Sequence, residues 1–340
     1  MSLPLLVPLT GINILLGVAL WLLGERGHVR LQSTKKWFRD PHWSPKGRWI
    51  NALHGYLYMR WQNQYIKHFV IQMGAIAPKP VREYFKDHYH SKVLTHENAV
   101  EIIKINENIP LQDLEQVVPY PNARNFLLSA PPEIIVYECG CRNSRENHCE
   151  TTQVCMWIGQ PYIDFILEHN PNSSRRLTQE EALKLLEEEH NRGHVHTAWF
   201  KDAMQDRFYC ICNCCSCCCA GIEAMRKYGT PFLAASGYLA QINHSLCKIC
   251  GHCAEVCPFE AVVIGANRVD ILAESCMGCA WIHAQNTPFN LYRIRPSASP
   301  LMSVPCCQPR RQTSESRFYY QPFSINSVWG PLCLLGKCPD

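Results

Sequence analysis

The distribution of hydrophobic and polar positions divides the chain into an uncharged start, a mostly helical stretch and a series of shorter elements. From Ser2 to Gly24 there is no charged residue, and this length is enough for a helix to cross a bilayer. Only Gly11 to Leu23 has a firmly helical pattern, so a buried helix is the alternative. Basic residues follow at once: Arg26, Arg30, Lys35, Lys36 and Arg39. By the positive-inside rule we expect residues 1–24 to form a membrane-anchor helix and the rest to face the cytoplasm.

Residues 25–130 have a mostly helical pattern and carry no recognisable chemical motif. Four tryptophans near basic residues are typical either of a membrane interface or of a small helical core. They are Trp37, Trp43, Trp49 and Trp61. The stretch from Thr95 to Asn108 predicts a helix with Thr95 as its N-cap, and its apolar spacing turns Val100 and Ile103 inward. The role of this region stays open.

Strands and helices alternate with cysteine-rich segments in residues 131–235. Glu133 to Tyr137 is a short β-type run that leads directly to a cysteine, and Arg207 to Ile211 does the same. Between them, Thr178 and Glu181 form a capping box that begins a helix, which Gly193 ends. This order predicts an α+β domain in which regular elements position loops of thiols.

Cysteine usage narrows the class of protein. The 340 residues include 21 cysteines, bunched as C-x-C, C-C and C-x2-C, which favours metal ligation over disulfides between distant residues. Adjacent cysteines rarely pair with each other because the geometry is strained, so we expect a reducing compartment. The net charge of +4 is too small to indicate nucleic acid, and no motif that reads RNA or DNA is present.

One cysteine motif is specific enough to predict its cofactor. The spacing C-x2-C-x2-C-x3-C-P occurs at Cys247, Cys250, Cys253, Cys257 and Pro258. It is the run of bacterial ferredoxins, in which three thiolates bind one 4Fe-4S cluster and the fourth reaches another. A zinc ribbon would need two C-x2-C pairs separated by a longer gap. With strand patterns at Ser236–Ile242 and Ala261–Ile264, residues 236–280 are predicted to be a ferredoxin-like β-α-β domain.

The second half of this motif is degenerate. Cys276 and Cys279 begin a partner motif, but Ile282 and Asn286 stand where two further cysteines belong. Each of two clusters would then lack one thiolate, and three thiolates hold either a 3Fe-4S cluster or a 4Fe-4S cluster with an open iron. Substitute ligands are available nearby: His283, Cys306 and Cys307. The domain therefore holds one or two clusters.

A frameshift is an alternative explanation of the missing cysteines. From Ala280 onward the chain loses ferredoxin character and becomes rich in Pro, Ser, Arg and Gln. The codons permitted for Trp281 to Phe289 allow, in another frame, Asp-Pro-Cys-Pro-Lys-His-Ala-Ile, which would complete the motif. On this hypothesis residues 281–340 are an irregular tail translated out of frame, and the nucleotide sequence tests it directly.

Two further cysteine groups lie upstream and are candidate metal ligands. The first has the pattern C-x-C-x7-C-x5-C and consists of Cys139, Cys141, Cys149 and Cys155. It is large enough for one cluster or one zinc ion, and Arg142 and Arg145 would offset its negative charge. The second group is Cys210, Cys212, Cys214, Cys215, Cys217, Cys218 and Cys219. Its spacing does not reveal which members bind metal, and structural cysteines are the alternative for both groups. Three histidines nearby could join them: His148, His194 and His196.

Several of these blocks resemble, in their order, a family of 4Fe-4S ferredoxin-domain proteins of anaerobic bacteria. The resemblance runs from about Ile134 to Cys279 and includes Gly193-His-Val-His196 and Cys212-Asn-Cys-Cys215. It implies 4Fe-4S clusters and electron transfer, whereas the broken second motif departs from the pattern. The family's own function is poorly defined.

Together these observations predict an α+β protein with an N-terminal hydrophobic helix, a mixed middle domain and a C-terminal ferredoxin-like domain. We expect an iron–sulfur electron carrier that exchanges electrons with protein redox partners, at a membrane or in the cytoplasm. One alternative is an oxidoreductase that binds substrate at an incompletely ligated cluster. Another is a structural protein with zinc at the upstream cysteines and one ferredoxin cluster. The oligomeric state is left open.

Overall fold

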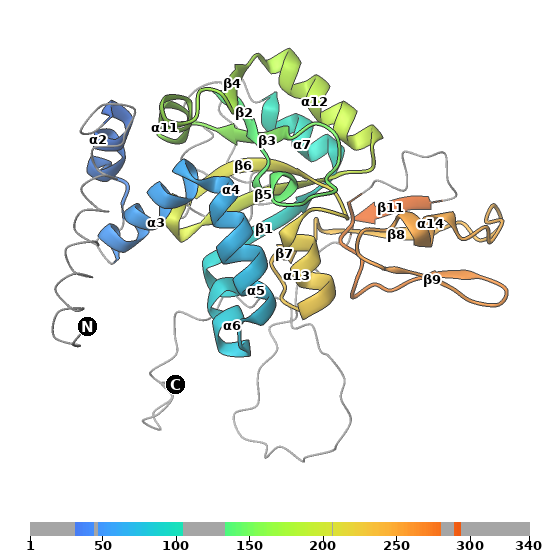
Figure 1. Cartoon of the computed structure of the whole chain (residues 1–340). Coiled ribbons are helices and arrows are strands. Elements are labelled where there is room, and N and C mark those ends of the chain that lie inside the picture. Colours follow the sequence, from blue (N-terminus) through green and yellow to red (C-terminus); the bar gives the residue numbers. More distant parts are fainter. Residues whose placement is uncertain (1–30, 44–46, 105–132, 206, 280–288, 294–340) are drawn as a thin grey trace, which may run out of the picture. The chain divides into compact units, whose positions relative to one another are not determined.

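The computed structural model describes residues 31–43, 47–104, 133–205, 207–279 and 289–293 (Figure 1). The predicted anchor helix at residues 1–24 and most of the tail after residue 280 lie outside these ranges. Within the described residues, no helix combines the length and the apolar character needed to cross a membrane.

A seven-stranded sheet in the order β4-β2-β3-β6-β5-β1-β7 forms the centre of the fold. Its strands are β1 (Tyr89–Leu94), β2 (Ile134–Glu138), β3 (Gln153–Ile158), β4 (Ser174–Leu177), β5 (Val195–Lys201), β6 (Arg207–Cys214) and β7 (Leu233–Ala234). Neighbouring strands are antiparallel except for β1 and β7, which are parallel. The strands expected at residues 133–137 and 207–211 are thus present, and β6 continues through three cysteines.

The region expected to be mostly helical contributes both helices and a strand. Its helices are α2 (Gln32–Arg39), α3 (Arg48–Arg60), α4 (Gln62–Tyr65), the π-helix η1 (Ile66–Gln72), α5 (Met73–Ile76), α6 (Lys79–His88) and α7 (His96–Ile103). Strand β1 follows α6 and pairs with β5, so residues on both sides of position 130 build one sheet. The side chain of Thr95 caps α7 by accepting a hydrogen bond from the backbone N–H of Asn98, as expected.

Helices cover both faces of the sheet. On one face, α7 and α12 (Gln179–Asn191) pack over buried residues that include Ile102, Leu186 and Phe208. On the other face, α2, α3 and α11 (Tyr162–His169) pack over an aromatic core centred on Trp37 and Trp157. Both hydrogen bonds of the predicted capping box of α12 are present: the Thr178 side chain accepts from the Glu181 backbone N–H, and the Glu181 side chain accepts from the Thr178 backbone N–H. Of the four tryptophans in the helical region, Trp37 and Trp43 are buried, Trp61 is half-buried and Trp49 is exposed.

The remaining elements surround the cysteines. Two short helices lie next to the upstream groups, α10 (Gly140–Asn143) and α13 (Ala220–Tyr228), and the 3-10 helix η3 (Asp202–Met204) precedes β6. The ferredoxin-type segment contains β8 (Tyr238–Ile242), α14 (His252–Val256), β9 (Val262–Ile264) and β10 (Val269–Ile271), which pairs with β9. Strand β11 (Phe289–Arg293) pairs with β8. The described part of the predicted irregular tail is therefore a strand.

Candidate iron–sulfur and metal sites

The ferredoxin loop connects β8 to α14 and has the backbone of a tight thiolate-binding loop. Ile249 and Gly251 adopt positive φ angles of 54° and 83°, which turn the chain sharply between successive cysteines. Cys257 directly follows α14, and its Sγ accepts a hydrogen bond from the backbone N–H of Ala261 at 3.4 Å. Such amide contacts stabilise a thiolate.

The four loop thiols differ in exposure. Cys247, Cys253 and Cys257 are half-buried, whereas Cys250 is exposed. Burial raises the pKa of Cys253, and hydrogen bonds from its own N–H and from that of Ala254 counteract this effect. Four thiols in this motif, with amides directed at them, fit a 4Fe-4S cluster, which Cys247, Cys250 and Cys253 would hold with one further ligand.

The partner motif lies against the same loop. Cys279 packs, together with Cys257, on a small hydrophobic core formed by Ile242, Val262 and Val269. Cys276 is half-buried. The positions of Ile282, His283 and Asn286 lie outside the described residues, as do Cys306 and Cys307. Whether a second cluster in this domain gains a fourth ligand there stays a prediction.

Seven upstream cysteines from four segments gather on one face of the central sheet. We call them the thiol ring: Cys139, Cys141, Cys155, Cys210, Cys212, Cys214 and Cys219. Three of them alternate along β6, and alternate residues of a strand point to the same face. Cys155 lies on β3, whereas Cys139 and Cys219 are the residues just before α10 and α13.

Thiol–thiol contacts connect the ring. The pKa of Cys155 lies well below its usual value because the thiol of Cys139 hydrogen-bonds to it, with further bonds from Cys210 and Cys212. The pKa of Cys141 is lowered by a bond from Cys139 and then by one from Cys219. Two ring members thus favour the thiolate form even in a buried setting, which is what metal ligation requires.

The start of helix α13 adds to this effect at Cys141. The backbone N–H of Ala220, the first residue of α13, hydrogen-bonds to the sulfur of Cys141 and lowers its pKa. A helix N-terminus carries a partial positive charge, so α13 stabilises negative charge on this part of the ring.

A cavity of about 110 Å³ adjoins the ring. Six ring cysteines line it, all except Cys210, together with apolar side chains such as Ile66 and Phe69. No three ring thiols lie within 4.8 Å of one another, since the described groups with that spacing lie elsewhere. A single ion needs closer sulfurs, because a tetrahedral Zn²⁺ site has S···S distances of about 3.8 Å. The wide ring therefore fits a polynuclear cluster better than one ion.

A buried arginine supplies the positive charge beside the ring. Arg142 is fully buried, and its guanidinium pairs with Glu189 at 2.6 Å and donates to the carbonyl of Thr151 at 2.6 Å. Its Nε has no hydrogen-bond partner among the described residues, and Arg142 lines the cavity. This buried donor is consistent with an anionic group in the cavity, because unpaired buried N–H groups are costly. Arg145, also expected to offset charge, pairs with Glu223 instead.

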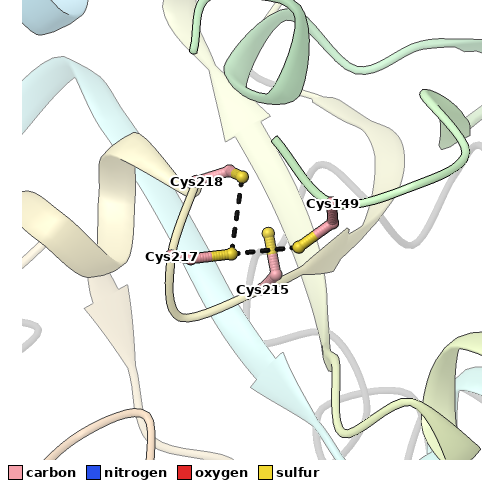
Figure 2. Close-up of side chains that lie close together, drawn as sticks. All are labelled: Cys149, Cys215, Cys217 and Cys218. Atoms are coloured by element: carbon pink, nitrogen blue, oxygen red, sulfur yellow. Dashed lines mark hydrogen bonds between the residues drawn. The ribbon is translucent and has the colours of Figure 1, made fainter. Parts of the chain in front are cut away.

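Four other cysteines form a compact group at the loop between β6 and α13 (Figure 2). We call them the four-thiol group: Cys149, Cys215, Cys217 and Cys218. Their sulfur atoms all lie within 4.8 Å, with Cys217 Sγ 3.0 Å from Cys149 Sγ and 3.5 Å from Cys218 Sγ. Burial and the contact with Cys217 raise the pKa of Cys149 to about 11. The tetrahedral spacing of about 3.8 Å lies within the 4.8 Å limit of this group, so the group fits one zinc or iron ion.

The structure divides the first upstream pattern between these two sites. Cys139, Cys141 and Cys155 belong to the ring, whereas Cys149 lies in the four-thiol group. The four therefore do not form one centre, because β3 returns Cys155 to the sheet after the loop has carried Cys149 outward. Of the three histidines considered as additional ligands, His194 hydrogen-bonds to Glu189 and His148 to the carbonyl of Cys149.

One hydrophobic cluster joins the ring to the ferredoxin-type segment. Its buried members include Cys214 and Cys219 of the ring together with Phe259 and Met277, and the half-buried Cys257 and Cys279 pack against it. An ion pair between Arg226 on α13 and Glu260 links the same two segments. Ligands of both candidate centres thus share a single packed core.

The comparison with known protein families supports the prediction that the ferredoxin loop binds an iron–sulfur cluster. Residues 240–263 match the family model for the 4Fe-4S binding domain. This segment is a ferredoxin-type iron–sulfur domain. The match contains all four loop cysteines in their C-x2-C-x2-C-x3-C spacing. No curated protein and no solved structure matches the chain, so the upstream sites rest on their own geometry.

Proposed function

We propose that this iron–sulfur protein is an electron carrier in which the ferredoxin loop exchanges electrons with a second iron–sulfur centre at the thiol ring. The observation that supports this function is the shared hydrophobic cluster, in which Cys214 and Cys219 pack with Cys257 and Cys279. Adjacent clusters pass single electrons, and the protein tunes their potentials through hydrogen bonds, charge and burial.

The two proposed centres differ in their exposure to solvent, and this difference suggests at which of them a redox partner docks. Cys250 is exposed, and so are the neighbouring apolar side chains of Leu246 and Ile249. Cys139, Cys155 and Cys214 of the ring are buried. A protein redox partner would thus dock at the loop, and the ring centre would receive or release electrons through it.

Each part of the chain has a distinct task in this proposal. The cysteines bind the iron, the loop amides and the start of α13 stabilise the thiolates, and Arg142 balances the charge of the ring centre. When bound, the clusters supply one-electron redox chemistry. The carrier needs a one-electron donor and a one-electron acceptor, and it returns to its starting state after each transfer.

The test is iron and acid-labile sulfide per chain after anaerobic purification, in wild type and in two serine variants. Wild type is expected to hold about eight irons, from two or more clusters. Cys250→Ser removes the loop cluster and Cys155→Ser removes the ring cluster, so each variant should lose about four irons. If Cys155→Ser keeps the full iron content, the ring does not hold a cluster and the proposal is wrong.

An oxidoreductase is the second candidate function, and the incomplete partner motif is the observation that favours it. Cys276 and Cys279 supply two thiolates, and Cys257 a third, for a cluster with an open iron. A substrate that binds this iron would change its EPR spectrum, whereas a pure carrier would show only shifts of potential. Titration of the reduced protein with small anions and thiols distinguishes the two.

Zinc at the four-thiol group is compatible with either function. Its compact geometry gives it the spacing of a structural metal site. Metal analysis decides between zinc and iron there: zinc predicts about one equivalent that disappears in Cys149→Ser while the iron content stays unchanged.

We also propose that the chain is held at the cytoplasmic side of a membrane by residues 1–24 and that it is related to the ferredoxin-domain family of anaerobic bacteria. The charge-free stretch and the basic residues after it support the first part. Exposed apolar side chains on α3, namely Trp49, Ile50 and Leu53, would suit a membrane surface. Removal of residues 1–24 should release the protein into the soluble fraction of a cell lysate.

A further inference from the structure

Three histidines that no cysteine motif includes come together on the other face of the sheet. His96 is the first residue of α7, His190 lies in the last turn of α12, and His196 lies on β5. One ring nitrogen from each lies within 4.8 Å of the other two. His196 pairs with Asn213 on β6, so its side chain lies on the face opposite to Cys212 and Cys214.

The nitrogen–nitrogen distance between two members of this trio matches that of a tetrahedral metal site. His96 Nδ1 lies 3.3 Å from His196 Nε2. Zn–N bonds of 2.0–2.1 Å imply N···N distances of about 3.3–3.4 Å along a tetrahedral edge. The ring centroids of His96 and His190 are 4.5 Å apart, and those of His190 and His196 are 5.8 Å apart. Ordinary hydrogen bonds explain one of these pairs, but they do not explain why three imidazoles converge from three elements.

Asn213 fixes the orientation of the central histidine. Its Nδ2 donates to the carbonyl of Val154 at 2.8 Å, so its Oδ1 is the acceptor for His196 Nδ1–H at 2.6 Å. The lone pair of His196 is therefore on Nε2, the atom that faces His96. A hydrogen bond that orients the second ring nitrogen is a usual feature of metal-binding histidines.

We propose that His96, His190 and His196 bind one divalent transition-metal ion, with Zn²⁺ as the reference, and leave a fourth coordination position open. Imidazole nitrogens suit Zn²⁺, Ni²⁺, Cu²⁺ and Fe²⁺, whereas Mg²⁺ and Ca²⁺ prefer oxygen ligands. His196 is buried and the other two are half-buried, so solvent or a small anionic ligand reaches the open position. The site is separate from the thiols and does not depend on the proposed electron transfer.

Cobalt is the probe, because its spectrum distinguishes nitrogen from sulfur ligands. The full chain is purified anaerobically with its iron, freed of loosely bound metal and titrated with Co²⁺. Imidazole-bound Co²⁺ gives weak visible bands without the strong near-ultraviolet sulfur-to-cobalt charge transfer of a thiolate site. Subtraction of the spectrum before addition removes the absorption of the iron–sulfur clusters.

The variants are His190→Gln on α12, His96→Gln on α7 and, as a matched control, His68→Gln, whose histidine is exposed on η1. We expect wild type and His68→Gln to bind one equivalent with the nitrogen-type spectrum. Each of the other two should bind it at least about a hundredfold more weakly, since even outer-shell changes cost 10–100-fold. Unchanged iron content and circular dichroism show that the variants fold.

Two results would overturn the site. One is a nitrogen-type spectrum of equal affinity in wild type and His190→Gln, because the ion would then be bound elsewhere. The other is the appearance of charge-transfer bands alone in wild type, because the thiols would then be the only ligands.

Discussion

The ferredoxin loop and the thiol ring bring their cysteines together in opposite ways. The loop takes four thiols from 11 consecutive residues, Cys247 to Cys257, and leaves one of them exposed. The ring takes seven thiols from segments as far apart as residues 139 and 219, and only the folded sheet brings them together. A local loop forms with little help from the rest of the chain, whereas the ring is inseparable from the fold.

This difference matches the roles proposed for the two candidate centres. An exposed local loop is accessible to a partner protein, and its packing demands on the rest of the chain are small. The buried ring is shielded from solvent, and the buried ion pair of Arg142 and Glu189 lies beside it. Changes at the ring should therefore destabilise the whole fold, whereas changes at the loop should affect electron entry alone.

The largest expected effect is the loss of stability in Cys155→Ser compared with Cys250→Ser. In the proposal Cys155 is a ligand of the ring centre, so its loss would remove that centre and the folding free energy that ligation would supply, which is about 10–16 kcal/mol for structural zinc sites. Thermal unfolding should show a fall in Tm of roughly 10 °C or more, at about 2–4 °C per kcal/mol.

Cys250→Ser is the matched control, since its side chain is exposed. It should lose loop iron while the Tm of the sheet stays within about 2 °C of wild type. Equal losses of Tm in the two variants would remove the distinction between a local and a fold-dependent centre.

A smaller loss of stability is expected when the buried ion pair beside the ring is broken. Glu189→Gln leaves Arg142 buried without its carboxylate, which costs about 3–5 kcal/mol. Urea unfolding measures this free energy, with Glu187→Gln on the exposed face of α12 as the control at about 0.5 kcal/mol or less. A small effect in Glu189→Gln would show that the Arg142 charge is balanced by the cluster itself.

The connection between the two centres can be weakened at Phe259. This buried side chain belongs to the hydrophobic cluster that both centres share, and Phe259→Ala should cost about 3 kcal/mol. We expect it also to slow the appearance of reduced ring centre after rapid mixing with a one-electron donor. Val263→Ala on β9, an exposed position, is the control. Unchanged kinetics in Phe259→Ala would place electron entry elsewhere.

The smallest effect is expected at the ion pair between Arg226 and Glu260. Both side chains are well exposed to solvent, so the pair contributes less than about 1 kcal/mol. Arg226→Ala should therefore leave iron content and Tm nearly unchanged. A loss as large as that in Phe259→Ala would mean that charge, and not apolar packing, holds the segments together.

The same local and non-local division explains what could be predicted from the sequence. The ferredoxin loop and the capping box at Thr178 are local patterns: the family match supports the first, and the structure confirms the second. The alternation of Cys210, Cys212 and Cys214 was visible in the sequence, and a strand that continued through it would have placed them on one face. Their partners Cys139 and Cys155 depend on strand order, which no short motif encodes.

Other features had no signal in the sequence. Strand β1 lies in a mostly helical region, and it is stabilised by pairing with β5, about 100 residues later. The convergence of His96 with His190 and His196 likewise depends on how α7 and α12 pack on the sheet. The sequence shows that Arg142 is a positive charge next to cysteines, but its pairing with Glu189 depends on how the chain folds.

The central claim is that two iron–sulfur centres lie in contact and exchange electrons, and EPR of the dithionite-reduced protein tests it most directly. Two adjacent reduced clusters interact magnetically, so wild type should show broadened or split signals that become simple in both Cys250→Ser and Cys155→Ser. A simple, single-cluster signal in wild type that persists unchanged in Cys155→Ser would contradict the account, because the ring would then hold no redox centre.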